Sequence, residues 1–141
     1  STSGGIMMLG PHCLKSWSST QRSPALSVFE AEYYALVDGA TRVLGVQAAA
    51  RALGVEAEDV VPEMRTDASS AKSVAARRGL GRVRHVEVRW LWLQQAVAEG
   101  RFRLRKVLGV VNPADVCTKH LSKNDIRQKL KTVNIEVKRK R

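Results

Sequence analysis

Short apolar segments separated by turn residues open the chain. Residues 6–9 are apolar and end at Gly10 and Pro11, and a second short segment with Cys13 and Trp17 follows. Glycine next to proline favours a tight turn between two extended segments. The pattern therefore predicts an N-terminal β-hairpin.

A long amphipathic helix is predicted after the hairpin. Ser27 and Glu30 have the spacing of a capping box, which satisfies free N–H groups at the start of a helix. Glycine commonly ends helices, so this helix is expected to run to about Leu53 and to end at Gly54. At helical spacing, one face carries the apolar residues Phe29, Tyr33, Leu36, Ala40, Val43 and Leu44.

The middle of the chain predicts shorter elements. Residues 60–67 form a candidate strand, and residues 69–78 form a candidate helix that Gly79 ends. Residues 86–98 fit two patterns, because their apolar positions alternate as in a strand and also recur at helical spacing. The length of this segment and its polar C-terminal continuation favour a helix.

The last predicted elements are a strand at residues 102–111 and a helix after it. Asn112 is a favourable N-cap for that helix, and Pro113 suits its first position. Residues 137–141 are expected to be a loose basic tail. The order of hairpin, helix, strand, helix, helix, strand and helix predicts an α/β domain with a mixed sheet and helices on both faces.

Basic residues outnumber acidic ones and are concentrated in two blocks. The 141 residues, a length that suits one domain, carry a net charge of +11. Residues 77–106 and 116–141 are strongly basic, whereas residues 30–63 are acidic. This distribution suggests nucleic acid as a partner, and the alternative is a solvated basic face. No apolar run has the length of a membrane span, and Cys13 and Cys117 form neither a disulfide framework nor a zinc cluster.

Three acidic residues stand at the ends of predicted elements. Glu32 lies in the opening turns of the long helix, Asp67 ends a strand, and Asp115 follows the Asn112 cap. Carboxylates that meet at one sheet edge can bind magnesium, and paired magnesium ions promote phosphodiester hydrolysis. Structural roles also explain these residues, with Asp67 as an N-cap and Asp115 beside a helix dipole. Glu30 lies about 200° around the helix from Glu32, so the two cannot share a site.

Several motifs occur together in the order of a known domain. They are Ser1-Thr2-Ser3-Gly4-Gly5, Ser16-Trp17-Ser18-Ser19-Thr20-Gln21, Glu30-Ala31-Glu32-Tyr33-Tyr34-Ala35-Leu36, Thr66-Asp67 with Ser70-Ala71, Arg84-His85-Val86 and Asn112-Pro113-Ala114-Asp115-Val116-Cys117-Thr118-Lys119. In this combination, residues 1–122 resemble the ribonuclease H domain at the C-terminal end of copia-type retrotransposon polyproteins. Residues 123–141 are then a basic C-terminal extension.

The resemblance implies a ribonuclease H-like fold and an endonuclease that hydrolyses the RNA strand of RNA–DNA hybrids with two magnesium ions. It implies that Glu32, Asp67 and Asp115 are both catalytic residues and metal ligands. The implied partners are an RNA–DNA hybrid or another nucleic acid and the remainder of the polyprotein, with no membrane. The implied location is intracellular, in a cytoplasmic virus-like particle or the nucleus. The candidate nucleic-acid contacts are Arg82, Arg84, His85, Arg89 and Lys119, although His85 is equally explained as a residue at a helix start.

The chain departs from the resemblance at its N-terminal end. The family's first catalytic Asp lies on a strand just before the Ser-Thr-Ser-Gly motif, and residues 1–29 contain no Asp or Glu. We therefore expect this first strand and its Asp to be missing from the chain. Two alternatives to a nuclease stay open: a catalytically inactive relic that binds nucleic acid, and a structural part of a polyprotein without activity of its own.

Overall fold

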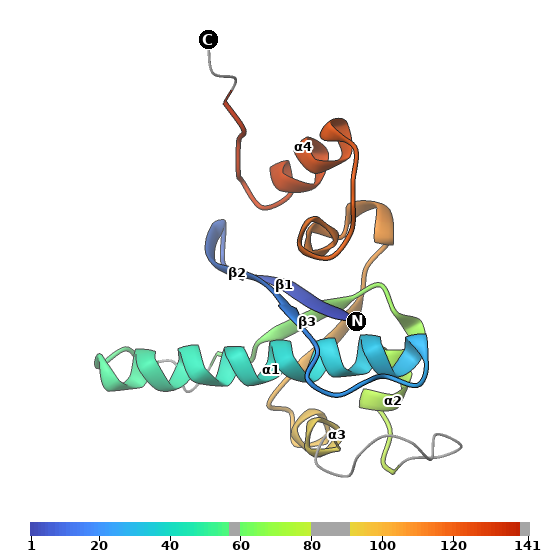
Figure 1. Ribbon diagram of the computed structural model, residues 1–141. Coiled ribbons are helices and arrows are strands. Elements are labelled where there is room, and N and C mark those ends of the chain that lie inside the picture. Colours follow the sequence, from blue (N-terminus) through green and yellow to red (C-terminus); the bar gives the residue numbers. More distant parts are fainter. Residues whose placement is uncertain (57–59, 80–90, 139–141) are drawn as a thin grey trace.

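The chain is a mixed α/β structure, seen in a computed structural model that describes residues 1–56, 60–79 and 91–138 (Figure 1). Its elements are, in chain order, β1 (Thr2–Leu9), β2 (His12–Thr20), α1 (Val28–Ala52), β3 (Glu63–Thr66), α2 (Ser69–Ala75), α3 (Trp92–Ala98), β4 (Arg103–Lys106), the 3₁₀ helices η2 (Gly109–Val111) and η3 (Pro113–Cys117), and α4 (Lys123–Lys131). The α/β class expected from the sequence agrees with this order.

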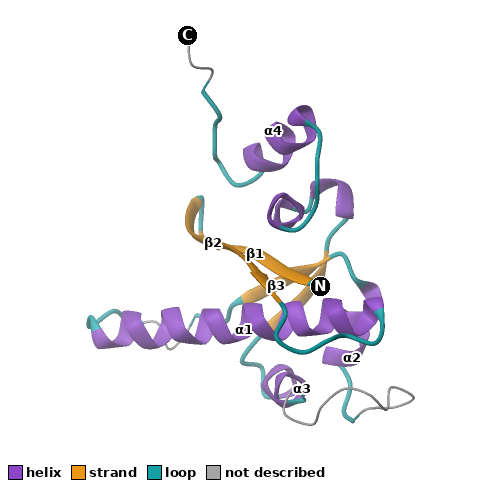
Figure 2. Ribbon diagram, in the orientation of Figure 1, coloured by secondary structure: helices purple, strands orange, loops and turns teal. Residues whose placement is uncertain are grey.

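The N-terminal hairpin is confirmed. β1 and β2 pair antiparallel, and Gly10 at the turn takes a positive φ of 57°, which glycine adopts without steric cost. Alternate residues of β1 face opposite sides. A side chain at Gly4 would collide with Cys117 of η3, whereas one at Gly5 would collide with the ring of Trp17. The hairpin therefore lies between α1 on one face and η3 on the other (Figure 2).

The strands in the second half form a separate sheet. β3 and β4 pair in parallel over four residues each. Within the described ranges, β1 bonds only to β2 and β3 only to β4, so the expected single mixed sheet is wrong and two small sheets stand in its place. Both strands are shorter than the expected 60–67 and 102–111. β4 ends early because the chain turns into η2, which brings Gly109 beside Asp67.

Helix α1 forms the centre of the core and begins as predicted. The Ser27 hydroxyl accepts a hydrogen bond from Glu30 N at 3.1 Å, and the Glu30 carboxylate accepts one from Leu26 N at 2.8 Å. Gly54, with a φ of 77°, follows its C-cap. The predicted apolar face packs into the core through Phe29, Tyr33, Leu36, Ala40, Val43 and Leu44. No helix in the described part of the chain combines the length and apolar character needed to cross a membrane.

Helices α2 and α3 lie on the side of α1 away from the hairpin (Figure 1). α2 is shorter than predicted, since it ends at Ala75 with Ala76 as its C-cap, and Gly79, which has a φ of 79°, lies three residues beyond that cap. α3 confirms the C-terminal part of the helix expected at 86–98, and its N-terminal part falls outside the described residues. The buried Gln94 side chain joins both helices, since it donates to Val74 O and accepts from Gly79 N, each at 2.8 Å.

The segment after Asn112 is helical but tighter than predicted. The Asn112 side chain accepts a hydrogen bond from Ala114 N at 3.1 Å, which confirms the predicted cap. The helix that it begins is η3, a 3₁₀ helix of five residues. This short helix packs against β1 and places Asp115 in its first turn.

Helix α4 is an addition to the predicted elements and lies inside the expected basic extension, residues 123–141. Its N-cap Ser122 accepts a hydrogen bond from Asp125 N at 3.1 Å. α4 packs against η3, and Lys129 and the following Val133 are buried. The first part of the extension is therefore joined to the body of the molecule.

Candidate functional site

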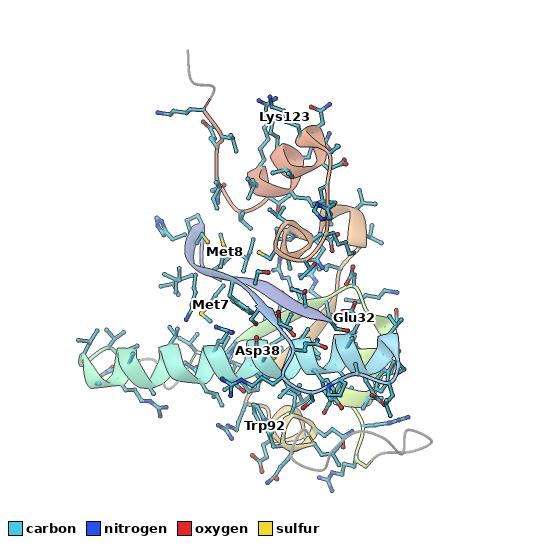
Figure 3. The ribbon with its side chains drawn as sticks, viewed as in Figure 1. Met7, Met8, Glu32, Asp38, Trp92 and Lys123 are labelled. Atoms are coloured by element: carbon cyan, nitrogen blue, oxygen red, sulfur yellow. The ribbon has the colours of Figure 1, made fainter. Side chains whose placement is uncertain are left out.

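The three acidic residues singled out from the sequence line the same cavity. Glu32 comes from the second turn of α1, Asp67 directly follows β3, and Asp115 lies in η3. The cavity has a volume of about 700 Å³, and the start of β1 also lines it through Thr2 and Gly4. Figure 3 shows Glu32 on the part of α1 next to the start of β1. Elements far apart in sequence thus bring three carboxylates to the same cavity.

The local structure separates Glu32 from Glu30. Glu30 is 2% exposed and its carboxylate is bonded at the helix start, whereas Glu32 lines the cavity. The two side chains leave α1 in different directions, as their angular separation predicts. Glu30 is therefore a capping residue, and Glu32 remains available to a ligand.

Asp67 does not have the capping role that was its structural alternative. The N-cap residue of α2 is Ala68, and no side chain caps the helix there. The Thr66 hydroxyl accepts a hydrogen bond from Ala68 N at 3.1 Å. The Asp67 carboxylate instead lies beside Gly109, where a Cβ atom would be 3.1 Å from Oδ2. A side chain at position 109 would therefore press on the Asp67 carboxylate, which would have to shift by a few tenths of an ångström.

The carboxylates influence one another across the cavity. Burial raises the pKa of Glu32 above its ordinary value of 4.5, and the negative charges of Asp67 and Asp115 raise it further. Lys119 opposes these effects without cancelling them. Negative charge at Glu32 is therefore incompletely compensated, and a bound cation would relieve it.

Asp115 has the opposite electrostatic surroundings. The Nζ atom of Lys119 lies 2.7 Å from Oδ1, and that of Lys129 lies 3.0 Å from Oδ2. Burial raises the pKa of Asp115, but the hydrogen bonds from Lys119 and Lys129 outweigh burial and hold the pKa below its ordinary value of 3.8. The same ion pair raises the pKa of Lys119. Asp115 is thus a fully compensated carboxylate.

The donor set fits a hard divalent cation in its chemistry. Carboxylate oxygens are the ligands that magnesium prefers, and three separate elements supply them to one cavity. As arranged, no three His, Cys, Asp or Glu side chains within residues 1–56, 60–79 and 91–138 form a group that could hold a metal ion. Both oxygens of Asp115 contact ammonium groups. A cation at Asp115 must therefore compete with a lysine.

The predicted nucleic-acid contacts are described only in part. Lys119 lines the cavity and its side chain is 54% exposed. The other four, Arg82, Arg84, His85 and Arg89, lie outside the described residues.

Two further basic residues belong to the site although the sequence motifs do not single them out. Arg65 lines the cavity directly before Thr66 and Asp67. Lys129 reaches Asp115 from α4, 14 positions further along the chain. The available signal for Lys129 was the N-cap pair Ser122 and Asp125, which predicts a helix through this position.

The chain is similar to one part of a plant transposon protein. Over 111 residues it is 29% identical to the retrovirus-related Pol polyprotein from transposon TNT 1-94 of Nicotiana tabacum, and the alignment covers 77% of this chain. The aligned region spans 8% of the length of that polyprotein. No protein-family profile and no solved structure matches the chain. The similarity supports an origin of this chain in a retrotransposon polyprotein.

Proposed function

We propose that the chain is part of a ribonuclease H-type endonuclease domain of a retrotransposon polyprotein. The observation that carries the proposal is the meeting of Glu32, Asp67 and Asp115 in one cavity, where burial and then the charges of the two aspartates raise the pKa of Glu32. The substrate would be the RNA strand of an RNA–DNA hybrid. Such a hybrid is recognised by its shape and its 2′-hydroxyl groups, without reading of the sequence.

Each part of the cavity has a role in this proposal. Glu32, Asp67 and Asp115 would hold two magnesium ions, which when bound activate the attacking water and stabilise the leaving oxygen. Arg65 and Lys119 line the same cavity and would bind phosphate oxygens of the substrate. The net charge of +11 favours approach of a polyanion to the whole chain.

The proposed fold is ribonuclease H-like with its first strand missing. The two small sheets support this, since β1 and β3 both pack on α1 but have no backbone pairing with each other in the described ranges. A strand placed between them would pair with both edges and join the two sheets. We propose that the remainder of the polyprotein supplies this strand and the Asp that the resemblance places on it.

The proposal is tested by cleavage of a labelled RNA–DNA hybrid with magnesium. The 141-residue chain and a version extended upstream through the first strand are compared, each beside its Asp67→Asn variant. We expect the extended form to cleave the RNA strand and Asp67→Asn to abolish cleavage. Binding of the hybrid without cleavage in both forms would rule out the nuclease.

An inactive relic that binds nucleic acid is the second candidate function. Asp115 is already paired with two ammonium groups, so a metal ion must compete with them for this carboxylate. Such a relic would bind the hybrid in the absence of magnesium, and its affinity would fall steeply with salt concentration. A gain of affinity with magnesium that Asp67→Asn removes would contradict it.

A further inference from the structure

The two lysines on Asp115 differ sharply in how they are fixed. The Lys119 side chain is 54% exposed and holds Oδ1 at 2.7 Å, whereas the Lys129 side chain is 7% exposed and holds Oδ2 at 3.0 Å. Lys119 lies one helical turn after Asp115, and Lys129 comes from α4. One carboxylate therefore has a surface partner on one oxygen and a buried partner on the other.

Lys129 is fixed by the backbone as well as by Asp115. Its ammonium donates to the carbonyl oxygens of Gly109 at 2.7 Å, Val110 at 3.0 Å and Asn112 at 3.2 Å. An ammonium group has three N–H donors, and with Asp115 Oδ2 there are four acceptors around it, so all three donors are used and at least one is shared between two acceptors. Movement of Lys129 would leave Asp115 Oδ2 and the three carbonyl groups without this donor, which is unfavourable.

Movement of Lys119 away from Asp115 costs much less free energy. Its side chain is largely in solvent, where an ion pair contributes little and the flexible stem can turn the ammonium back to water. Lys119 and Asp115 both line the cavity that also contains Glu32 and Asp67. A cation that enters this cavity thus meets Asp115 through the oxygen whose partner leaves most easily.

We propose that Lys119 is an exchangeable placeholder for a divalent cation at Asp115 Oδ1, and that Lys129 is a permanent counterion that keeps Oδ1 turned to the cavity. The inference rests on the proposed function, since it assumes that the cavity takes a divalent cation. It also assigns α4 a positioning role in the site. When the cation binds, the ammonium of Lys119 leaves Asp115 and becomes free to contact a phosphate.

The test is the binding of Mn²⁺ to the 141-residue chain, followed by the electron paramagnetic resonance signal of free Mn²⁺. Lys119→Met keeps the aliphatic stem and removes the competing charge, so it should tighten Mn²⁺ binding roughly fivefold, the factor equivalent to a favourable exposed ion pair. The matched control is Lys131→Met on α4, an exposed lysine whose removal changes the net charge equally. It should change the affinity by less than about twofold, because it acts only through the screened long-range field.

The role of Lys129 is tested with Lys129→Met, by thermal unfolding and by the same titration. The variant should unfold at a clearly lower temperature than wild type and should not gain affinity for Mn²⁺. Failure of Lys129→Met to fold would also support a permanent counterion, and the Lys119→Met titration then still decides the exchange. A gain of affinity in Lys129→Met as large as that in Lys119→Met would overturn the assignment of the two lysines.

The outcomes separate this inference from the proposed function. If wild type binds Mn²⁺ through Asp67, as shown by loss of binding in Asp67→Asn, and Lys119→Met has wild-type affinity, the inference alone is overturned. If neither the 141-residue chain nor the version extended through the first strand binds Mn²⁺, or if Asp67→Asn binds it unchanged, the proposed metal site and the inference are both overturned.

Discussion

The two walls of the cavity shift the pKa values of their carboxylates in opposite directions. On the wall made by α1 and β3, burial and neighbouring negative charge raise the pKa of Glu32. On the wall made by η3, the ammonium groups of Lys119 and of Lys129 from α4 lower the pKa of Asp115 although burial acts against them. Both residues are acids with restricted access to water, so the difference comes from the cations that the local elements supply.

The C-terminal segment supplies the buried counterion of Asp115. Among residues 1–56, 60–79 and 91–138, no lysine forms an ion pair with Glu32 of α1 or with Asp67 after β3, whereas α4 brings Lys129 to Asp115. The carboxylates of Glu32 and Asp67 can therefore accept an added cation, whereas Asp115 already has a fixed one in the ammonium of Lys129. The two walls should therefore respond differently when a charge is removed.

The largest expected effect comes from removing the carboxylate of the compensated wall. Asp115→Asn leaves the ammonium of Lys129 buried without its counterion, and breaking a buried ion pair from one side costs about 3 kcal/mol. We expect the free energy of unfolding, measured with urea, to fall by that amount.

The matched control for Asp115→Asn is Asp38→Asn on α1. Asp38 forms an ion pair with Arg42 at 3.0 Å, but its side chain is 32% exposed. Removing it should cost less than about 1 kcal/mol. Equal losses of unfolding free energy in the two variants would show that burial of Lys129 does not strengthen its pair with Asp115. The proposed difference between the two walls would then be wrong.

A smaller effect is expected from two glutamates that lie two positions apart on α1. Glu30→Ala removes the acceptor of Leu26 N and should lower the free energy of unfolding by about 2 kcal/mol. Glu32→Ala removes a carboxylate that burial and neighbouring acids disfavour, so its cost should be close to zero. Urea unfolding of both variants measures the difference. A larger loss of stability for Glu32→Ala than for Glu30→Ala would show that Glu30 is not the glutamate with the structural role.

The parts of the fold that local sequence specifies were predictable. α1 follows from Ser27, Glu30 and the apolar spacing after them, because capping and amphipathic spacing act within a few residues. The hairpin follows from the turn at Gly10 in the same way. The positions of Glu32 and Asp67 at element ends likewise indicated that they would lie near one rim.

The parts that depend on distant contacts were not predictable. Separation into two sheets depends on which strands pair. The apolar pattern of a strand predicts that the strand exists, but it does not determine which other strand it pairs with. The partners of Lys129 are Asp115 and three backbone carbonyls, 14 to 20 positions away, and backbone carbonyls carry no side-chain signature. From the sequence alone, Lys129 is one basic residue among many in a basic segment.

The dependence of stability on pH should have opposite signs for the two walls. The folded chain holds the proton of Glu32 more tightly than the unfolded chain does, so this group lowers stability as pH rises from 4.5 through its raised pKa. Asp115 is the reverse, since its contribution is present above 3.8 and is lost as pH falls through its lowered pKa. Urea unfolding across this range should show Glu32→Gln flattening the first slope and Asp115→Asn the second. If Glu32→Gln steepens the loss of stability with rising pH, the assigned direction is wrong.

The smallest expected effect is on the stability of Lys119→Met. Asp115 keeps Lys129 as its counterion in this variant, and the lost pair is one in which the lysine side chain is 54% exposed. The free energy of unfolding should therefore change by less than about 0.5 kcal/mol in urea, against a loss several times larger in Lys129→Met. Similar large losses in both variants would mean that the two ammonium groups act as one unit on Asp115. Neither lysine would then be free to exchange with a cation. Asp115, Lys119 and Lys129 would instead form one rigid cluster of charges, and the proposed difference between the two lysines would be wrong.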